Sequence, residues 1–264
     1  MTNHDGPWPT GTPSWTDLGV EDVAAARAFY SALLGWDIQD GPDDAGGYLM
    51  ATLNGRPVAG IGPKMTEDPT PNAWMTYLAT DDADATAKRI VDAGGSVFMP
   101  PFDVLDVGRM TVAADAGGAV FGVWQGSKHQ GAAVVNEPGA LCWNEIHTRH
   151  YAATQAFYAT VYGYEFQEIG DGKDFVYSVA TIAQGEPSIA GLLDDPAVPE
   201  GIDGYWLTWF AVADADEAAR QVAALGGTVI VPPSDSPFGR MTIAVGAQGE
   251  TFGLIDLASA AAPA

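Results

Sequence analysis

The spacing of apolar residues changes near the start of the chain, and each change predicts an element. Residues 14–20 alternate between apolar and polar side chains, as in a half-buried strand. Residues 22–34 carry apolar side chains three and four positions apart, as in a helix that is buried on one side. Asp22 is a suitable N-cap for this helix, and Gly35 is a suitable C-terminal stop. A strand followed by a helix is therefore the first predicted unit.

Turn residues then separate shorter apolar runs. Residues 48–53 and 58–61 are predicted strands on either side of Asn54-Gly55, a strong hairpin signal. After a loop rich in Pro and Thr, the same order begins again. The second set is predicted as a strand at 74–80, a helix at 83–93, a strand at 97–99, and a hairpin of 109–114 and 119–124 through Gly117-Gly118. The second set has the order β-α-β-β-β, and the first set follows the same order with one fewer predicted strand.

The chain repeats itself after about 130 positions. Segment 13–36 returns as 141–164, so that Trp15 corresponds to Trp143 at an offset of 128. Gly95 corresponds to Gly227 at an offset of 132, and the Gly-Arg-Met of 108–110 returns at 239–241. Offsets that drift by so few residues indicate two homologous domains with small loop insertions.

The repeat predicts an α+β protein with four βαβββ units in two tandem domains. The expected boundaries are 10–125 for the first domain, 126–139 for a linker of turn residues, and 140–258 for the second domain. Helices would cover one face of each mixed sheet. The other face would curve around a cavity, which is a common place for a ligand.

The pattern L-x-V-x-D-x-x-x-A-x-x-F-Y-x-x-x-L-G-W from Leu18 to Trp36 resembles the opening of units in the vicinal oxygen chelate superfamily. That superfamily includes glyoxalase I, extradiol dioxygenases and the fosfomycin- and bleomycin-resistance proteins. The tandem form, with VNEPGALCWNEI between its halves, resembles the two-domain glyoxalase-like proteins of actinobacteria, including the 27 kDa antigen type. The resemblance covers about residues 10–257 and indicates the fold, not the substrate.

Composition narrows the classes of partner. The 264 residues include 34 acidic and 11 basic side chains, for a formal charge of −23, which disfavours nucleic acid and anionic membrane surfaces as partners. The single cysteine, Cys142, excludes an internal disulfide and a cysteine-based metal cluster. There is no apolar run of membrane-spanning length and no secretory signal pattern. We expect a cytoplasmic protein with a small-molecule partner, and a monomer in preference to a homodimer.

The resemblance implies a metal site, and the residues argue against one. Catalytic members hold a divalent metal with His, Glu or Gln from the first and last strands of paired units. The first-strand position, five residues before the Val of the pattern, falls on Trp15 and Trp143. The other positions fall on Gly60, Met75 and Gly122 in the first half, and on Gly191, Leu207 and Gly253 in the second. None of these side chains binds such a cation, so we expect no metal and no other cofactor.

Strand alternation predicts which side chains face the two cavities. Trp15 and Asp17 share the cavity face in the first half, and Trp143, Glu145 and His147 share it in the second. The further candidates for ligand contact are Tyr48, Tyr77, Trp124, Trp209, Arg109 and Arg240. The alternatives are that the tryptophans fill the core, that the carboxylates have structural partners, and that the arginines form ion pairs or lie on a solvated rim.

Two hypotheses about function follow. The first is a metal-free binding protein for a planar or hydrophobic organic molecule, with or without an amine, in natural-product resistance or biosynthesis. The second is a metal-independent lyase, isomerase or hydroxylase-type enzyme in which Asp17 or Glu145 is the base and His147 an acid or base. Metal-dependent glyoxalase or dioxygenase chemistry is disfavoured by the Trp, Gly, Met and Leu residues at the ligand positions.

Overall fold

The first half of the chain forms one eight-stranded mixed sheet and two helices. The computed structural model describes residues 2–64, 71–173 and 175–260. In sequence order, the elements of this half are β2 (Pro13–Val20), α1 (Val23–Leu34), β3 (Asp37–Asp40), β4 (Leu49–Leu53), β5 (Arg56–Pro63), β6 (Ala73–Ala79), α2 (Ala83–Asp92), β7 (Ser96–Val104), β8 (Gly108–Ala114) and β9 (Val120–Gly126). The strands lie in the order β3-β4-β5-β2-β6-β9-β8-β7. Two βαβββ units therefore share one sheet.

The second half repeats this arrangement. Its elements are β11 (Leu141–Thr148), α3 (Tyr151–Tyr162), β12 (Glu165–Glu168), β13 (Tyr177–Thr181), β14 (Ala190–Asp194), β15 (Gly204–Ala211), α4 (Ala215–Ala224), β16 (Thr228–Ser236), β17 (Gly239–Val245), β18 (Thr251–Asp256) and a short 3-10 helix η1 (Leu257–Ser259). The strand order is β12-β13-β14-β11-β15-β18-β17-β16, and β10 (Val134–Val135) and β1 (Thr2–Asn3) join this sheet beside β11. The predicted α+β class with four repeated units is confirmed.

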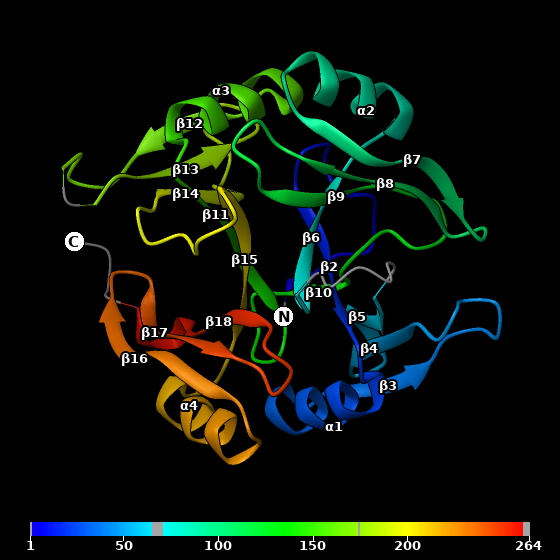
Figure 1. Cartoon of the computed structure of the whole chain (residues 1–264). Coiled ribbons are helices and arrows are strands. Elements are labelled where there is room, and N and C mark those ends of the chain that lie inside the picture. The colour runs from blue at the N-terminus through cyan, green and yellow to red at the C-terminus, as the bar shows by residue number, and fades with distance from the viewer. Residues whose placement is uncertain (1, 65–70, 174, 261–264) are drawn as a thin grey trace.

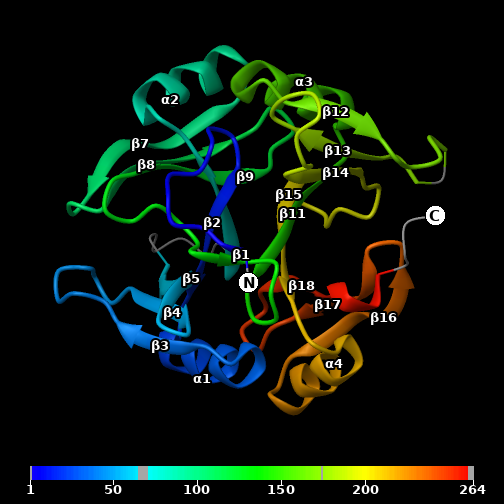
Figure 2. The same ribbon diagram turned by 180° about the vertical axis from the view of Figure 1, so that it is seen from behind.

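The two sheets stand back to back. Figure 1 shows one sheet opening to the right and the other to the left, with α2 and α3 side by side at the top and α1 and α4 at the bottom. Figure 2 shows the same arrangement from behind. At the centre, where β6 meets β15, the Thr76 hydroxyl donates to Asn144 Oδ1 at 2.8 Å, and the Thr208 hydroxyl donates to the same oxygen at 3.3 Å. The two concave faces therefore point away from each other.

Each helix packs into an apolar core that contains residues from both halves of the chain. Phe29 and Tyr30 of α1 pack with Phe210 and Phe252 of the second half, and Phe121 of the first half packs with the helix α3. In the first core, the Trp74 indole donates to Tyr30, whose hydroxyl donates to the buried Glu250 at 2.8 Å. The two halves are thus joined by shared apolar cores and by hydrogen bonds that satisfy the buried polar groups.

Local signals explain most of the element boundaries. The Asp22 side chain accepts from the Ala25 N–H at the start of α1, and Gly35 ends the helix with a φ of 70°, as predicted. The strand predicted at 97–99 is longer, and includes Pro100 and Pro101. Because β7 is the edge of its sheet and is bulged against β8, these prolines remove no ladder bond that the sheet needs. Within the described residues, no helix is both long and apolar enough to span a membrane.

Candidate functional site

Two aromatic rings and a carboxylate form a hydrogen-bonded chain on the concave face of the first sheet. The Trp15 Nε1 donates to the Tyr48 hydroxyl at 3.0 Å, and this hydroxyl donates to Asp17 Oδ2 at 3.4 Å. Tyr77 stands opposite Trp15 on the neighbouring strand β6. Removal from solvent raises the pKa of Asp17 to about 6, although hydrogen bonds from Tyr77 and Tyr48 act to lower it. The structure thus brings four of the predicted residues together.

The concave face of the second sheet carries the same chain, with Trp209 at the position of Tyr77. The Trp143 Nε1 donates to the Tyr177 hydroxyl at 3.0 Å, and Tyr177 donates to Glu145 Oε2 at 2.9 Å. The Trp209 Nε1 donates to the other oxygen, Glu145 Oε1, at 3.0 Å. Glu145 is 9% exposed, so its oxygens depend mainly on these protein donors for hydrogen bonds. Glu145 is therefore the centre of the second network.

A histidine between two carboxylates distinguishes the second face from the first. His147 Nδ1 lies 2.8 Å from Asp195 Oδ2, and His147 Nε2 lies 3.1 Å from Glu145 Oε1. The imidazole also stacks on Tyr205, with ring centroids 4.8 Å apart. Burial lowers the pKa of His147, but the hydrogen bonds and charges of Glu145 and Asp195 outweigh burial and raise the pKa above its usual value. This ring is held in one orientation, and the carboxyl groups at its two nitrogens favour its protonated form.

Glycine makes room for a ring beside each of these strands. An alanine Cβ at any of four glycines would come far inside van der Waals contact with an aromatic side chain. The added Cβ would lie 1.7 Å from the Tyr48 hydroxyl at Gly60, and 2.1 Å from the Tyr77 ring at Gly122. In the second half it would lie 2.0 Å from the Tyr177 hydroxyl at Gly191, and 2.1 Å from the Trp209 ring at Gly253. The rings lie directly on the backbone of the neighbouring strand. The glycines are therefore part of the site.

The first concave face is covered by the chain itself. Trp124 Nε1 donates to the His129 carbonyl at 2.9 Å, and the His129 ring meets Trp15 edge-on with centroids 4.4 Å apart. This contact is made by the segment 126–139, which the sequence predicts as a linker, so the part of that segment around His129 lies against the first sheet. Burial lowers the pKa of His129 to about 4, so the ring is neutral. Trp124 is consequently in contact with the linker.

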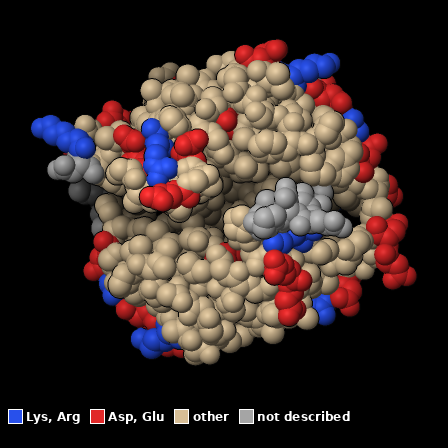
Figure 3. All heavy atoms as spheres, in the orientation of Figure 1, with Lys and Arg blue, Asp and Glu red and all other residues tan. Residues whose placement is uncertain are grey.

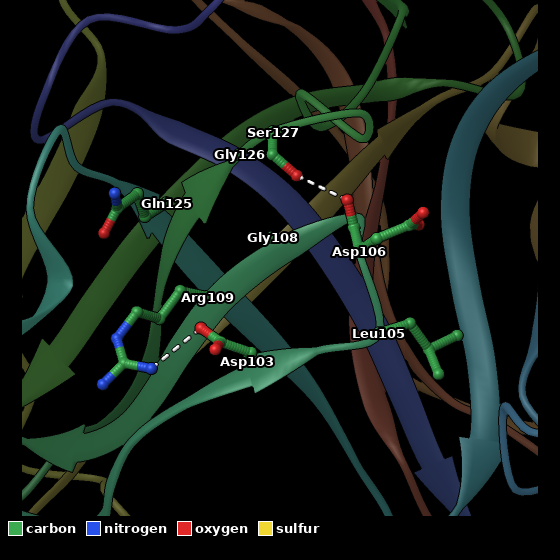
Figure 4. Close-up of a pocket in the computed structure, with 8 residues that line it drawn as sticks. All are labelled: Asp103, Leu105, Asp106, Gly108, Arg109, Gln125, Gly126 and Ser127. Atoms are coloured by element: carbon green, nitrogen blue, oxygen red, sulfur yellow. Dashed lines mark hydrogen bonds and ion pairs between the residues drawn. The ribbon is translucent and has the colours of Figure 1, made fainter.

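Arg109 and Arg240 are not brought into either network. Arg240 alternates with Met241, which packs on the concave side, so its guanidinium reaches the helix side and pairs with Asp216 of α4. Arg109 in the same way pairs with Asp84 of α2, and with Asp103. Figure 4 shows Arg109 and Asp103 beside a depression where β7 passes into β8. This depression has a volume of about 270 Å³, and no residue of the carboxylate networks lines it. Both arginines therefore form ion pairs with aspartates, which was one of the alternatives to ligand contact.

The first face predicts two opposite effects of pH on stability. Asp17 binds its proton more tightly in the folded chain, so its contribution to the free energy of unfolding increases as the pH falls through about 6. His129 binds its proton more weakly when folded, so its contribution is lost as the pH falls through 6.5 towards about 4. From pH 7.5 to 4.5, wild type should gain on the order of 2–3 kcal/mol relative to Asp17→Asn, and lose a similar amount relative to His129→Gln.

Urea unfolding of the three proteins at several pH values measures both differences. Each variant serves as the control for the other, because a general effect of acid on this strongly anionic chain would act on all three proteins alike. Differences that do not change with pH, or that change in the same direction for both variants, would contradict the burial of these two groups.

A family model for the Glyoxalase/Bleomycin resistance protein/Dioxygenase superfamily matches residues 12–123 and 140–253, which is most of each half. The chain belongs to this superfamily. The chain is 41% identical over 252 residues to CFP32 of Mycobacterium tuberculosis, which is named as a glyoxylase. The match covers 93% of this chain and 94% of CFP32. The chain is 36% identical over 263 residues to the anthracycline biosynthesis protein DnrV of Streptomyces peucetius, covering 94% of each.

The fold is similar to that of solved glyoxalase-superfamily structures. The Mn(II)-bound glyoxalase of Novosphingobium aromaticivorans matches with a TM-score of 0.62 at 17% identity, over 96% of this chain and 86% of that one. At this identity the likeness shows the fold alone.

The residues at the superfamily's metal positions do not fit a divalent cation. Indoles stand at the first-strand positions, and each glycine position lies under a tyrosine or tryptophan ring that fills the space above it. The neighbouring carboxylates, Asp17 and Glu145, already accept hydrogen bonds from these rings. Among the described residues, no group of three or more His, Cys, Asp or Glu is arranged to hold a metal ion. We therefore derive no chemical step through a metal.

Sequence reasoning missed Tyr177, Asp195 and Tyr205. Tyr177 lies 129 positions after Tyr48, within the range of offsets that the repeat had already given, so the repeat alone could have identified it. Tyr205 follows from strand alternation, because it lies two residues before Leu207 on β15. Asp195 has no such signal, because it lies in a loop after β14, and its equivalent in the first half is Lys64.

Proposed function

We propose that this protein binds a planar aromatic organic molecule on the concave face of its second sheet, without a metal ion. The observation that carries the proposal is the Glu145 network, which lies under aromatic side chains that stay partly exposed. An amine or hydroxyl group of the ligand would face Glu145, and its ring system would lie against Trp143 and Tyr205. The biological role would be in natural-product resistance or biosynthesis.

The exposed parts of the second face support a flat, apolar guest. Trp143, Met241 and Ile243 are only partly buried there, and Phe175 is 48% exposed while its ring stacks on Tyr177. Figure 3 shows the molecule hollowed on its left side, between the part that carries β12–β14 and the part that carries β16–β18. Aromatic stacking contributes about 0.5–1.5 kcal/mol beyond area burial, which favours a ligand with rings.

The charge of the second face supports a ligand that carries a donor or a positive charge. Glu145 and Asp195 place a carboxyl group at each nitrogen of His147, so acidic side chains outnumber basic ones in this cluster. Indole and phenol faces also attract cations, by about 0.5–2 kcal/mol. The relative DnrV is named for anthracycline biosynthesis, and an anthracycline has a flat, fused-ring core, which agrees with this ligand class.

Three anthraquinones with the same rings and different charges test the proposal. We expect 2-(aminomethyl)anthraquinone to bind about ten-fold more tightly than 2-(hydroxymethyl)anthraquinone, and anthraquinone-2-carboxylate to bind weakest, in the presence of EDTA. Glu145→Gln should remove the preference for the cation, since it removes one negative charge. Asp17→Asn, on the first face, is the matched control and should leave the order unchanged. Isothermal titration calorimetry gives all the constants, and absence of binding by the whole series would contradict the proposal.

A second candidate function is acid–base catalysis without a metal. The specific observation is that His147 is fixed by Asp195 on one nitrogen and meets Glu145 with the other, an arrangement that orients a ring for proton transfer. If this function is correct, a bound ligand is converted to product, and His147→Gln abolishes conversion while changing binding little. Chromatography of ligand recovered after long incubation distinguishes conversion from binding alone.

A further inference from the structure

The chain that leaves β9 turns back across the first concave face. The His129 carbonyl accepts from the Trp124 indole at 2.9 Å, and the His129 ring lies edge-on to Trp15 with an interplanar angle of 83°. His129 Nε2 is buried and has no hydrogen-bond partner among the described residues. The imidazole therefore contributes its flat ring to this face, and no side-chain hydrogen bond.

Backbone hydrogen bonds fix this segment in place. The Ala132 N–H donates to the Ser14 carbonyl at 2.7 Å, and the Ala133 N–H donates to the Pro57 carbonyl at 2.8 Å. Gly131 has a φ of +112°, and a Cβ there would lie 2.4 Å from the Ser14 carbonyl oxygen. A residue other than glycine could not make this approach. The segment is thus built to lie on the strand beside Trp15.

The second face has no equivalent cover among the described residues. After β18 the chain forms η1, where Ser259 Oγ donates to the Asp256 carbonyl and accepts from the Arg240 N–H, at the start of β17. Met241 and Ile243 remain partly exposed, whereas their first-half equivalents Met110 and Val112 are each only 6% exposed. As far as the described residues 2–64, 71–173 and 175–260 go, the duplicated scaffold therefore has one covered face and one open face.

The two faces hold their first indole in the same way. Trp15 donates to Tyr48, and Trp143 donates to Tyr177, each at 3.0 Å. We infer that residues 128–135 are a built-in ligand of the first face, and that each chain takes one external ligand, whose ring lies edge-on to Trp143 as His129 lies on Trp15. This inference rests on the proposed function, and adds to it the stoichiometry and the pose. The part of the external ligand that contacts Trp143 is an uncharged aromatic ring system. Any ammonium group of the ligand is a substituent of that ring system and reaches Glu145.

The stoichiometry of the external ligand is the first test. Titration of wild type with 2-(aminomethyl)anthraquinone should give one site per chain. Trp143→Ala should weaken this site about 30-fold, since it removes the aromatic contact, while Trp15→Ala should change the constant less than about three-fold. Two sites, one of which depends on Trp143 and the other on Trp15, would overturn the inference and leave the proposed function standing. A single site that depends on Trp15 and not on Trp143 would contradict both. No binding in any variant would contradict both.

Removal of the built-in ring is the second test. His129→Gly should leave an apolar space beside Trp15 that accepts 4-methylimidazole, which restores the imidazole in place. We expect 4-methylimidazole to raise the unfolding temperature of His129→Gly and to leave that of wild type and of the double variant Trp15→Ala/His129→Gly unchanged. A rise of equal size in all three proteins, or none in His129→Gly, would show that the segment does not act as a ligand.

Discussion

Gly253→Ala should lower the free energy of unfolding by about 3 kcal/mol, because the new methyl group and the Trp209 ring cannot occupy the same space. The added Cβ would lie 2.1 Å from the ring, and Trp209 is 3% exposed and bonded to Glu145, so it has no free direction in which to move. Overpacking and the loss of the indole hydrogen bond both contribute. Chemical denaturation measures the change.

Gly19→Ala is the matched control for this prediction. Gly19 also lies on a central strand, and a Cβ there would have nothing nearer than Lys64, at 3.8 Å. Its substitution should change stability by less than about 0.5 kcal/mol, or raise stability, because alanine loses less backbone entropy on folding. In the background of Trp209→Ala, Gly253→Ala should have little further effect. Equal losses at Gly19 and Gly253 would show that the ring is not the cause.

Glu145→Ala should cost about 3–5 kcal/mol and abolish ligand binding, because it leaves buried donors without an acceptor. The Tyr177 hydroxyl, the Trp209 indole and His147 all meet this carboxylate. The pKa of His147 should also fall towards its ordinary value, since the hydrogen bond and charge of Glu145 help to raise it. Urea unfolding and imidazole NMR titration measure the two effects independently.

Glu145→Gln and Asp17→Ala show whether the losses of stability and of ligand binding come from the carboxylate of the second face. Glutamine keeps the shape and one acceptor oxygen, so we expect it to cost about half as much stability as alanine. Asp17→Ala removes the equivalent carboxylate from the covered face and should leave ligand binding intact. Should Asp17→Ala abolish binding as fully as Glu145→Ala does, the assignment of the site to the second sheet would be wrong.

The sequence predicted the fold well because every unit occurs four times. Asp22, Gly35 and the Asn54-Gly55 turn are local signals, and the repeat checks each of them against a second copy. The edge strand β3 was missed because Ile38 is its only buried residue, which leaves no alternation to detect. The cover over the first face could not be predicted, because His129 and Gly131 lie among turn residues whose packing depends on the assembled sheet.

Strand alternation predicted part of the candidate site, and the rest of the site lies in loops, which alternation does not describe. The placement of Trp15, Asp17, Trp143 and Glu145 on the concave faces follows from the phase of their strands. The same phase, applied to Met241, would have placed Arg240 on the helix side. Asp195 reaches His147 only through the loop that follows β14, and a contact made by a loop has no periodic signal in the sequence.

The most direct test of a metal-free site on the second sheet is a crystal structure of the protein with 2-(aminomethyl)anthraquinone, grown in EDTA. We expect one ligand per chain, with its rings against Trp143 and its ammonium group directed at Glu145, and residues 128–135 still in place over Trp15. A ligand on the first sheet, or a metal ion coordinated between the strands despite the chelator, would contradict the account.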